Sequence, residues 1–160
     1  IPQSTYPPSQ GGYWQHMIPD EKVNSALILG LGAGTIPRLL FEKNPKIEIT
    51  AVDNSKETVN FAKKHFRLNE LKMKIIIADA FELVKRNPER YDYIAVDIWN
   101  GQWFPFTALM PPFIDHCKTL LNDNGWLYIN TPNLDFFAKE NLKEGLRDDI
   151  GRNILYRWKK

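Results

Sequence analysis

Residues 26–35, Ala-Leu-Ile-Leu-Gly-Leu-Gly-Ala-Gly-Thr, constrain the fold of this chain more than any other stretch. An apolar run ends in three glycines at alternate positions, Gly30, Gly32 and Gly34, and a helical pattern follows at once. A buried strand, a tight glycine turn and a helix form a cradle for a nucleotide-like ligand, because the free N–H groups at the helix start face an anion. The dinucleotide fingerprint Gly-x-Gly-x-x-Gly is not met, since Thr35 stands where its third glycine belongs.

Apolar strand patterns alternate with helical patterns along the rest of the chain. We expect strands at 26–30, 47–53, 73–79, 91–97, 126–131 and 153–158, and helices at 35–43, 54–68, 80–86, 112–121 and 135–147. Five strand-then-helix units predict a single doubly wound, Rossmann-like α/β domain, with a mostly parallel sheet and helices on both faces. The expected division is an amino-terminal arm with a short helix over 1–25 and the domain proper over 26–160.

Two local patterns make sharper structural predictions. Asn54, with Glu57 three residues later, resembles a capping box that begins the second helix. Three consecutive isoleucines at 75–77 indicate a third strand that is covered on both faces.

Acidic residues stand at the predicted carboxyl ends of three strands, where sheets of this kind bind their ligands. Asp53 follows Gly32 by 21 residues and could accept both hydroxyls of a ribose; the alternative is a surface acid or part of a helix cap. Asp79 could accept from an adenine amino group beside the Ala80 N–H, and it could also cap the next helix. Asp97 ends an apolar strand, so its carboxylate is expected to have a cationic partner.

Composition excludes several classes of protein. A formal net charge of +2 gives no clear nucleic-acid footprint, and the apolar runs are shorter than the ~18 residues of a membrane span. The single cysteine, Cys117, excludes an internal disulfide and favours a cytoplasmic location. It falls on an apolar helical stripe, so we expect packing rather than catalysis, and His65 and His116 are expected to be ordinary helix residues. No residue spacing is typical of a metal site or of a Ser-His-Asp arrangement.

Five segments together resemble the spermidine synthase family, within the S-adenosylmethionine-dependent methyltransferase fold. They are Leu-Ile-Leu-Gly-Leu-Gly-Ala-Gly-Thr (27–35), Ile-Thr-Ala-Val-Asp (49–53), Ala-Asp-Ala-Phe-Glu (78–82), Tyr-Asp-Tyr-Ile-Ala-Val-Asp (91–97) and Leu-Asn-Asp-Asn-Gly-Trp-Leu-Tyr (121–128). The resemblance implies binding of S-adenosylmethionine or its decarboxylated form. The implied cofactor-binding residues are Gly30, Gly32, Gly34, Asp53, Asn54, Asp79, Ala80 and Asp97. Asp97 would lie nearest the transferring group, and Asn100 is the second catalytic candidate.

Two positions depart from the aminopropyl-transferring members of that family, which carry aspartates where this chain has Ala33 and Asn100. Residues 98–112 also contain no acid, whereas a pocket for a polyamine needs several carboxylates. The sequence therefore favours methyl transfer to an unidentified acceptor. Aminopropyl transfer to an amine is one alternative, and a non-catalytic cofactor-binding or dimerising module is another.

Four aromatic residues in the same loop suggest a second feature of the site. Trp99, Trp103, Phe104 and Phe106 would form an apolar lid that stacks on a flat acceptor or faces a cation. Plain packing, or the contact of a homodimer formed through this loop, is an equally good interpretation.

Overall fold

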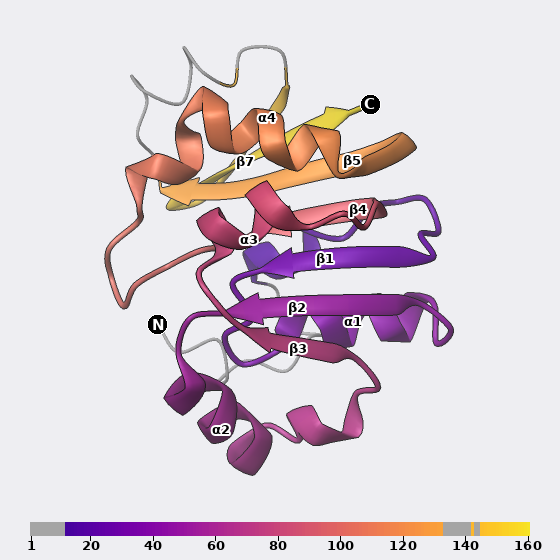
Figure 1. The fold of residues 1–160 in the computed structure, drawn as a ribbon, viewed down its shortest axis with the longest axis vertical. Coiled ribbons are helices and arrows are strands. Elements are labelled where there is room, and N and C mark those ends of the chain that lie inside the picture. The colour runs from indigo at the N-terminus through magenta and orange to yellow at the C-terminus, as the bar shows by residue number, and fades with distance from the viewer. Residues whose placement is uncertain (1–11, 133–141, 143–144) are drawn as a thin grey trace.

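A seven-stranded sheet forms the centre of the computed structural model, which describes residues 12–132, 142 and 145–160 (Figure 1). The strands are β1 (Ser25–Leu29), β2 (Glu48–Asp53), β3 (Lys74–Ile77), β4 (Tyr91–Val96), β5 (Leu121–Pro132), β6 (Leu146–Ile150) and β7 (Asn153–Lys159). The α-helices are α1 (Thr35–Lys43), α2 (Lys56–His65), α3 (Ala80–Arg86) and α4 (Pro111–Thr119). The 3-10 helices within the described residues are η3 (Tyr13–Gln15), η4 (Leu68–Glu70) and η5 (Phe106–Leu109).

The strand order, β3-β2-β1-β4-β5-β7-β6, confirms the doubly wound α/β fold. Strands β1 to β5 pair in parallel, whereas β7 runs antiparallel to β5, and β6 antiparallel to β7. The chain passes from β1 outward to β2 and β3, then returns to the other side of β1 as β4. The order therefore reverses between β1 and β4, and the carboxyl ends of these strands are where such a sheet offers a crevice.

Helices cover both faces of the sheet, as predicted. Successive residues of β1 point to opposite faces, and both faces are buried: Leu27 and Leu29 join one core, and Ile28 joins the other. The first core includes buried residues of α3, α4 and η5, and the second includes those of α1, α2 and η3. A strand covered on both sides must be apolar throughout, which explains the uninterrupted apolar run before the glycines.

Local signals placed some helix boundaries correctly and others incorrectly. Helix α1 ends before Asn44-Pro45, and α3 spans the predicted residues. The cap of α2 is Ser55, whose Oγ accepts a hydrogen bond from the Thr58 N–H at 3.0 Å. The prediction that Asn54 caps this helix is therefore wrong, because the cap lies one residue later and Asn54 is exposed. Helix α2 also ends at His65, three residues before the predicted end.

Three predictions about strands are corrected by the sheet. Strand β3 lies at its edge, and Ile77 is 45% exposed, so this strand is not covered on both faces. Asn124 and Gly125 lie inside β5 rather than between a helix and a strand. Leu146 and Arg147 belong to β6, so a helix reaching residue 147 is wrong, and residues 135–141 and 143–144 of that prediction lie outside the described residues.

Asp92 connects three segments at the end of the sheet where the parallel strands begin, opposite the end that carries the glycine turn. Its Oδ2 accepts from the backbone N–H groups of Asn24 (2.9 Å) and Ser25 (3.2 Å), and its Oδ1 accepts from Asn122 Nδ2 (2.9 Å). Burial raises the pKa of Asp92, but these hydrogen bonds outweigh burial and hold the pKa below its ordinary value.

Among the described residues, no helix is long and apolar enough to cross a membrane.

Candidate functional site

The glycine turn connects β1 to α1 through left-handed backbone. Gly30, Gly32 and Gly34 have φ angles of 93°, 51° and 82°. A Cβ on Gly30 would lie 2.2 Å from the carbonyl oxygen of Asp97, and one on Gly34 would lie 2.3 Å from Leu68 Cδ1. At Gly30 the nearby atom is backbone, so close packing requires glycine as well as φ does. At Gly34 the nearby atom is the end of a side chain, so the positive φ is the stronger reason for glycine.

Asp53 lies at the carboxyl end of β2 and reaches the glycine turn. Its Oδ2 accepts a hydrogen bond from the Gly32 N–H at 3.1 Å, and its Oδ1 accepts one from the Ser55 N–H at 2.9 Å. Each carboxylate oxygen has two lone pairs, so a bound ligand could still donate to both. The structure thus brings together two predicted site residues that stand 21 positions apart.

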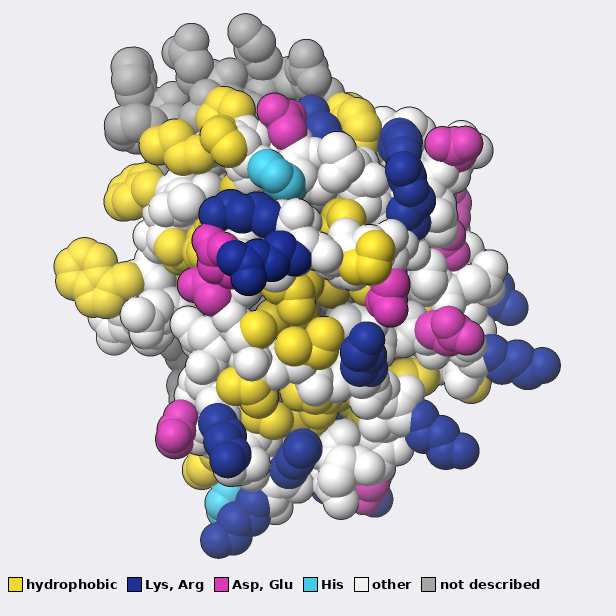
Figure 2. Space-filling model, in the orientation of Figure 1, with side chains coloured by type: hydrophobic (Ala, Val, Ile, Leu, Met, Phe, Trp, Pro, Cys, Tyr) yellow, Lys and Arg dark blue, Asp and Glu magenta, His cyan; other side chains and the backbone are white. Residues whose placement is uncertain are grey.

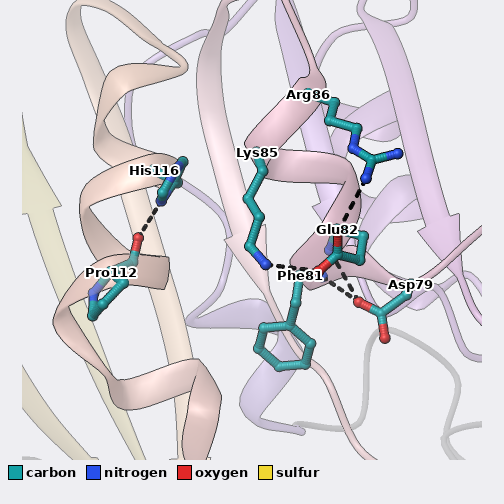
Figure 3. Close-up of polar contacts among 7 residues, drawn as sticks. All are labelled: Asp79, Phe81, Glu82, Lys85, Arg86, Pro112 and His116. Carbon is teal, nitrogen blue, oxygen red and sulfur yellow. Dashed lines mark hydrogen bonds and ion pairs between the residues drawn. The ribbon is translucent and has the colours of Figure 1, made fainter.

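Asp79 begins α3 and caps it, as one of its two predicted roles requires. Its Oδ1 accepts from the N–H groups of Phe81 (2.7 Å) and Glu82 (3.1 Å), as Figure 3 shows. The Glu82 side chain instead pairs with Lys85 at 2.6 Å and Arg86 at 3.7 Å, so it does not complete a capping box. Asp79 is exposed and Ala80 is buried, which leaves the carboxylate accessible to a ligand at this edge.

Asp97 is the buried acid of the site, with 4% of its surface exposed. Its Oδ1 accepts from Trp99 Nε1 at 3.1 Å and from Asn130 Nδ2 at 2.8 Å. The Tyr13 hydroxyl lies 3.2 Å from Oδ1 and 3.0 Å from Oδ2. These three donors are neutral, and their hydrogen bonds offset part of the cost of burying the charge. The expected cationic partner, the amino group or sulfonium of a bound cofactor or the amine of a substrate, stays a prediction.

Two of these donors were not among the candidates from the sequence. Tyr13 lies in the amino-terminal arm, where we expected only a short helix, and the sequence does not indicate its contact with Asp97. Asn130 is 1% exposed and interrupts the apolar run 126–129, which is the signal that could have drawn attention to it. Its Oδ1 accepts in turn from Asn153 Nδ2 at 2.9 Å.

The loop over residues 98–112 divides its aromatic side chains between core and solvent. Phe104 is 8% exposed, and its ring packs edge to face against that of Trp99, with 5.5 Å between the ring centroids. Trp103 is 81% exposed and Phe106 is 50% exposed. Figure 2 shows hydrophobic side chains projecting at its left edge, where this loop and the carboxyl ends of the strands lie in Figure 1. Asn100 is exposed in a tight turn, and its backbone pairs with that of Trp103.

Cys117 and two of the three histidines lie on helices. Cys117 is fully buried on α4, and burial raises the pKa of its thiol. His65 lies on α2 and His116 on α4, where the His116 ring contacts the carbonyl oxygen of Pro112 one turn earlier (Figure 3). Within the described part of the chain, no group of three or more His, Cys, Asp or Glu residues could hold a metal ion.

The strand order and the glycine turn, with acids at neighbouring strand ends, define the Rossmann-like fold of class I methyltransferases. The sequence model of the methyltransferase small domain matches residues 14–144, so the chain belongs to that family.

Curated relatives include two kinds of transferase. An N-terminal histidine N-methyltransferase of Emericella nidulans is 35% identical over 121 residues, which cover 72% of this chain and 21% of that protein. A probable polyamine aminopropyl transferase of Bifidobacterium longum is 28% identical over 130 residues, covering 81% of this chain and 29% of that protein. The chain thus spans less than a third of the length of each of these two relatives.

Solved structures show the same fold at low identity. Human methyltransferase-like protein 13, in complex with SAH, has a TM-score of 0.72 and 21% identity, covering 83% of this chain and 70% of that chain. A spermidine synthase, in complex with the transition-state analogue AdoDATO, has a TM-score of 0.73 and 16% identity, covering 92% of this chain and 60% of that chain. The resemblance stated from the sequence, to spermidine synthases within the methyltransferase fold, is confirmed.

Proposed function

We propose that the chain binds S-adenosylmethionine at the carboxyl ends of β1, β2 and β4 and transfers its methyl group to an acceptor. The observation that carries this proposal is the hydrogen bond between the Asp53 carboxylate and the Gly32 N–H at 3.1 Å. It supports the proposal because a carboxylate that could accept from ribose hydroxyls lies directly beside a turn whose backbone a ligand can approach closely.

The other candidate residues extend this site along the same edge of the sheet. Gly30, Gly32 and Gly34 would line the methionyl end of the cofactor, and Asp53 with its neighbour Asn54 would bind the ribose. Asp79 and the Ala80 N–H would bind the adenine, since Asp79 uses only Oδ1 in the cap of α3. A bound S-adenosylmethionine supplies a methyl carbon made electrophilic by the sulfonium, so the protein mainly has to position the acceptor and exclude water.

Asp97 is the residue best placed to interact with positive charge near the transferring group. Its side chain is buried, and its backbone carbonyl packs against Gly30 at the carboxyl ends of β1 and β4. A charge in such surroundings is screened less by solvent than one at the surface, so it would attract a cofactor or acceptor cation strongly. Asn100, three residues later in the exposed turn, would contact the acceptor.

Aminopropyl transfer from decarboxylated S-adenosylmethionine is the second candidate, because polyamine aminopropyltransferases are among the relatives. Two observations favour methyl transfer over it. Ala33 gives the glycine turn no carboxylate, and residues 98–112, which begin beside Asp97, contain no acid. An acceptor with several ammonium groups would find little compensating charge in this loop.

Titration calorimetry separates these candidates. We expect S-adenosylmethionine and S-adenosylhomocysteine to bind more tightly than decarboxylated S-adenosylmethionine. The reverse preference would overturn the proposal of methyl transfer. A methyl-transfer assay with labelled S-adenosylmethionine against nucleic-acid, small-amine and protein acceptors then tests catalysis. Binding without turnover on any of them would favour the third hypothesis, a non-catalytic cofactor-binding or dimerising module.

A further inference from the structure

Two buried or half-buried amides extend the hydrogen-bond network of Asp97 across two further strands. Asn130 of β5 donates its Nδ2 to Asp97 Oδ1 at 2.8 Å, and its Oδ1 accepts from Asn153 Nδ2 of β7 at 2.9 Å. Asn130 is 1% exposed, so neither end of its amide has water as an alternative partner. The three side chains form one continuous chain from β7 to β4.

The chemistry of the carboxylate fixes the direction of this chain. An ionised carboxylate only accepts hydrogen bonds, so Asn130 must present its NH₂ group to Asp97 and its carbonyl oxygen to Asn153. Asn153 must then present its own NH₂ group to that oxygen. If Asn130 turned over, two oxygens would face each other in a buried site, at the cost of an unsatisfied buried polar group.

The topology explains why β7 can take part. Asn153 is the first residue of β7, directly after the turn at Gly151 and Arg152 that follows β6. Because β7 is antiparallel to β5, it begins at the edge where β4 and β5 end. A parallel strand in its place would bring its last residue, rather than its first, to this end of the sheet.

We propose that Asn130 and Asn153 are positioning residues that together orient the Asp97 carboxylate for binding the cofactor. The inference rests on the proposed function for its ligand, and on the structure alone for the chain of hydrogen bonds. Tyr13 and Trp99 also hold Asp97, but they come from a short 3-10 helix and a loop, whereas Asn130 is anchored in a central strand. In this proposal the first residue of β7 acts on the Asp97 carboxylate through Asn130.

The direct test is Asn153→Asp, an isosteric change that replaces the donor NH₂ group with an acceptor and touches neither Asp97 nor the glycine turn. We expect the affinity for S-adenosylmethionine, measured by titration calorimetry, to fall by about three- to tenfold, as for the loss of one hydrogen bond. In an Asp97→Asn background the same change should cause no further loss. Unchanged affinity, or equal losses in the two backgrounds, would overturn the proposal.

Asn122→Asp is the matched control. It makes the same chemical change in a side chain that hydrogen-bonds Asp92 at the other edge of the sheet. We expect it to lower the melting temperature and to leave the affinity for S-adenosylmethionine unchanged. A comparable loss of affinity in this control would show that Asn153→Asp acts through general destabilisation, which also overturns the proposal.

A second readout uses no ligand and separates this proposal from the proposed function. If the unmodified protein binds no S-adenosylmethionine, the proposed function fails, but melting temperatures without ligand still test the hydrogen-bond chain. The four proteins to compare are the unmodified protein, Asn153→Asp, Asp97→Asn and the double variant. We expect Asn153→Asp to lower the melting temperature less in the Asp97→Asn background, because Asn130 can then turn over without facing a carboxylate. Equal decreases would mean that Asn153 does not act through Asp97.

Discussion

Gly30 and Asp97 approach each other so closely that a Cβ on Gly30 would lie 2.2 Å from the Asp97 carbonyl oxygen. This contact joins the ends of β1 and β4, the two strands between which the sheet reverses its order. The turn that would receive the cofactor and the acid that would face its reactive end are therefore held together by backbone packing.

Substitution of Gly30 tests that contact. We expect Gly30→Ala to destabilise the protein by about 3 kcal/mol or more, because the new methyl group would meet backbone that cannot move aside. Gly101→Ala is the control: its φ is also positive, at 63°, but no atom lies within 4 Å of the added Cβ. The control should lose only about 1–2 kcal/mol, the cost of left-handed backbone. Similar midpoints for the two variants in urea unfolding would contradict the steric explanation.

Asp53 is expected to contribute directly to cofactor affinity. Asp53→Ala should weaken the binding of S-adenosylmethionine by about 1–3 kcal/mol, because the ribose loses its acceptor and Gly32 loses its hydrogen-bond partner. Asp123→Ala is the control, because this acid is 97% exposed near the start of β5, at the end of the sheet opposite the glycine turn. It should leave the affinity for S-adenosylmethionine unchanged. Calorimetry of both variants measures the difference. Equal affinities would remove Asp53 from the site.

The lowered pKa of Asp92 predicts how stability responds to acid. A carboxyl group whose pKa is lower in the folded than in the unfolded protein stabilises the fold fully above its unfolded value of about 3.9. That contribution is lost as the pH falls through the folded pKa. We expect unmodified protein to be more stable than Asp92→Asn at pH 7, and the gap to narrow towards pH 3. Midpoints of urea unfolding across this pH range measure the difference in stability. A difference that does not change with pH would contradict the lowered pKa of Asp92.

The loop over residues 98–112 offers two neighbouring aromatics in opposite surroundings. Trp103→Ala should leave the free energy of unfolding within about 0.5 kcal/mol, since the ring is 81% exposed. Phe104→Ala should cost about 3–5 kcal/mol, since that ring is 8% exposed. Sedimentation equilibrium of the same proteins tests the homodimer hypothesis: a dimer that dissociates on Trp103→Ala supports it, and an unmodified protein that is monomeric contradicts it.

Much of the fold follows from local signals in the sequence. The apolar run before Gly30, the stop at Asn44-Pro45 and the cap at Asp79 each depend on residues within a few positions, so the corresponding elements could be predicted. Local signals could not distinguish a strand at the lateral edge of the sheet from a strand at its centre. The isoleucines of β3 have the composition of a buried strand, yet no further strand pairs beyond them in the described sheet.

The sequence by itself determined the class of fold, the family resemblance and the acids at the strand ends, because strand and helix periods and glycine spacing are properties of short segments. Only the tertiary structure decided which side chains meet: Tyr13, Trp99 and Asn130 around Asp97, and Asn153 behind Asn130. Tyr13, Asn130 and Asn153 come from three segments far from Asp97 in the sequence, and the convergence of Asn130 and Asn153 on Asp97 depends on strand order and on the antiparallel direction of β7. No local pattern encodes either of these, since both follow from how the whole chain packs.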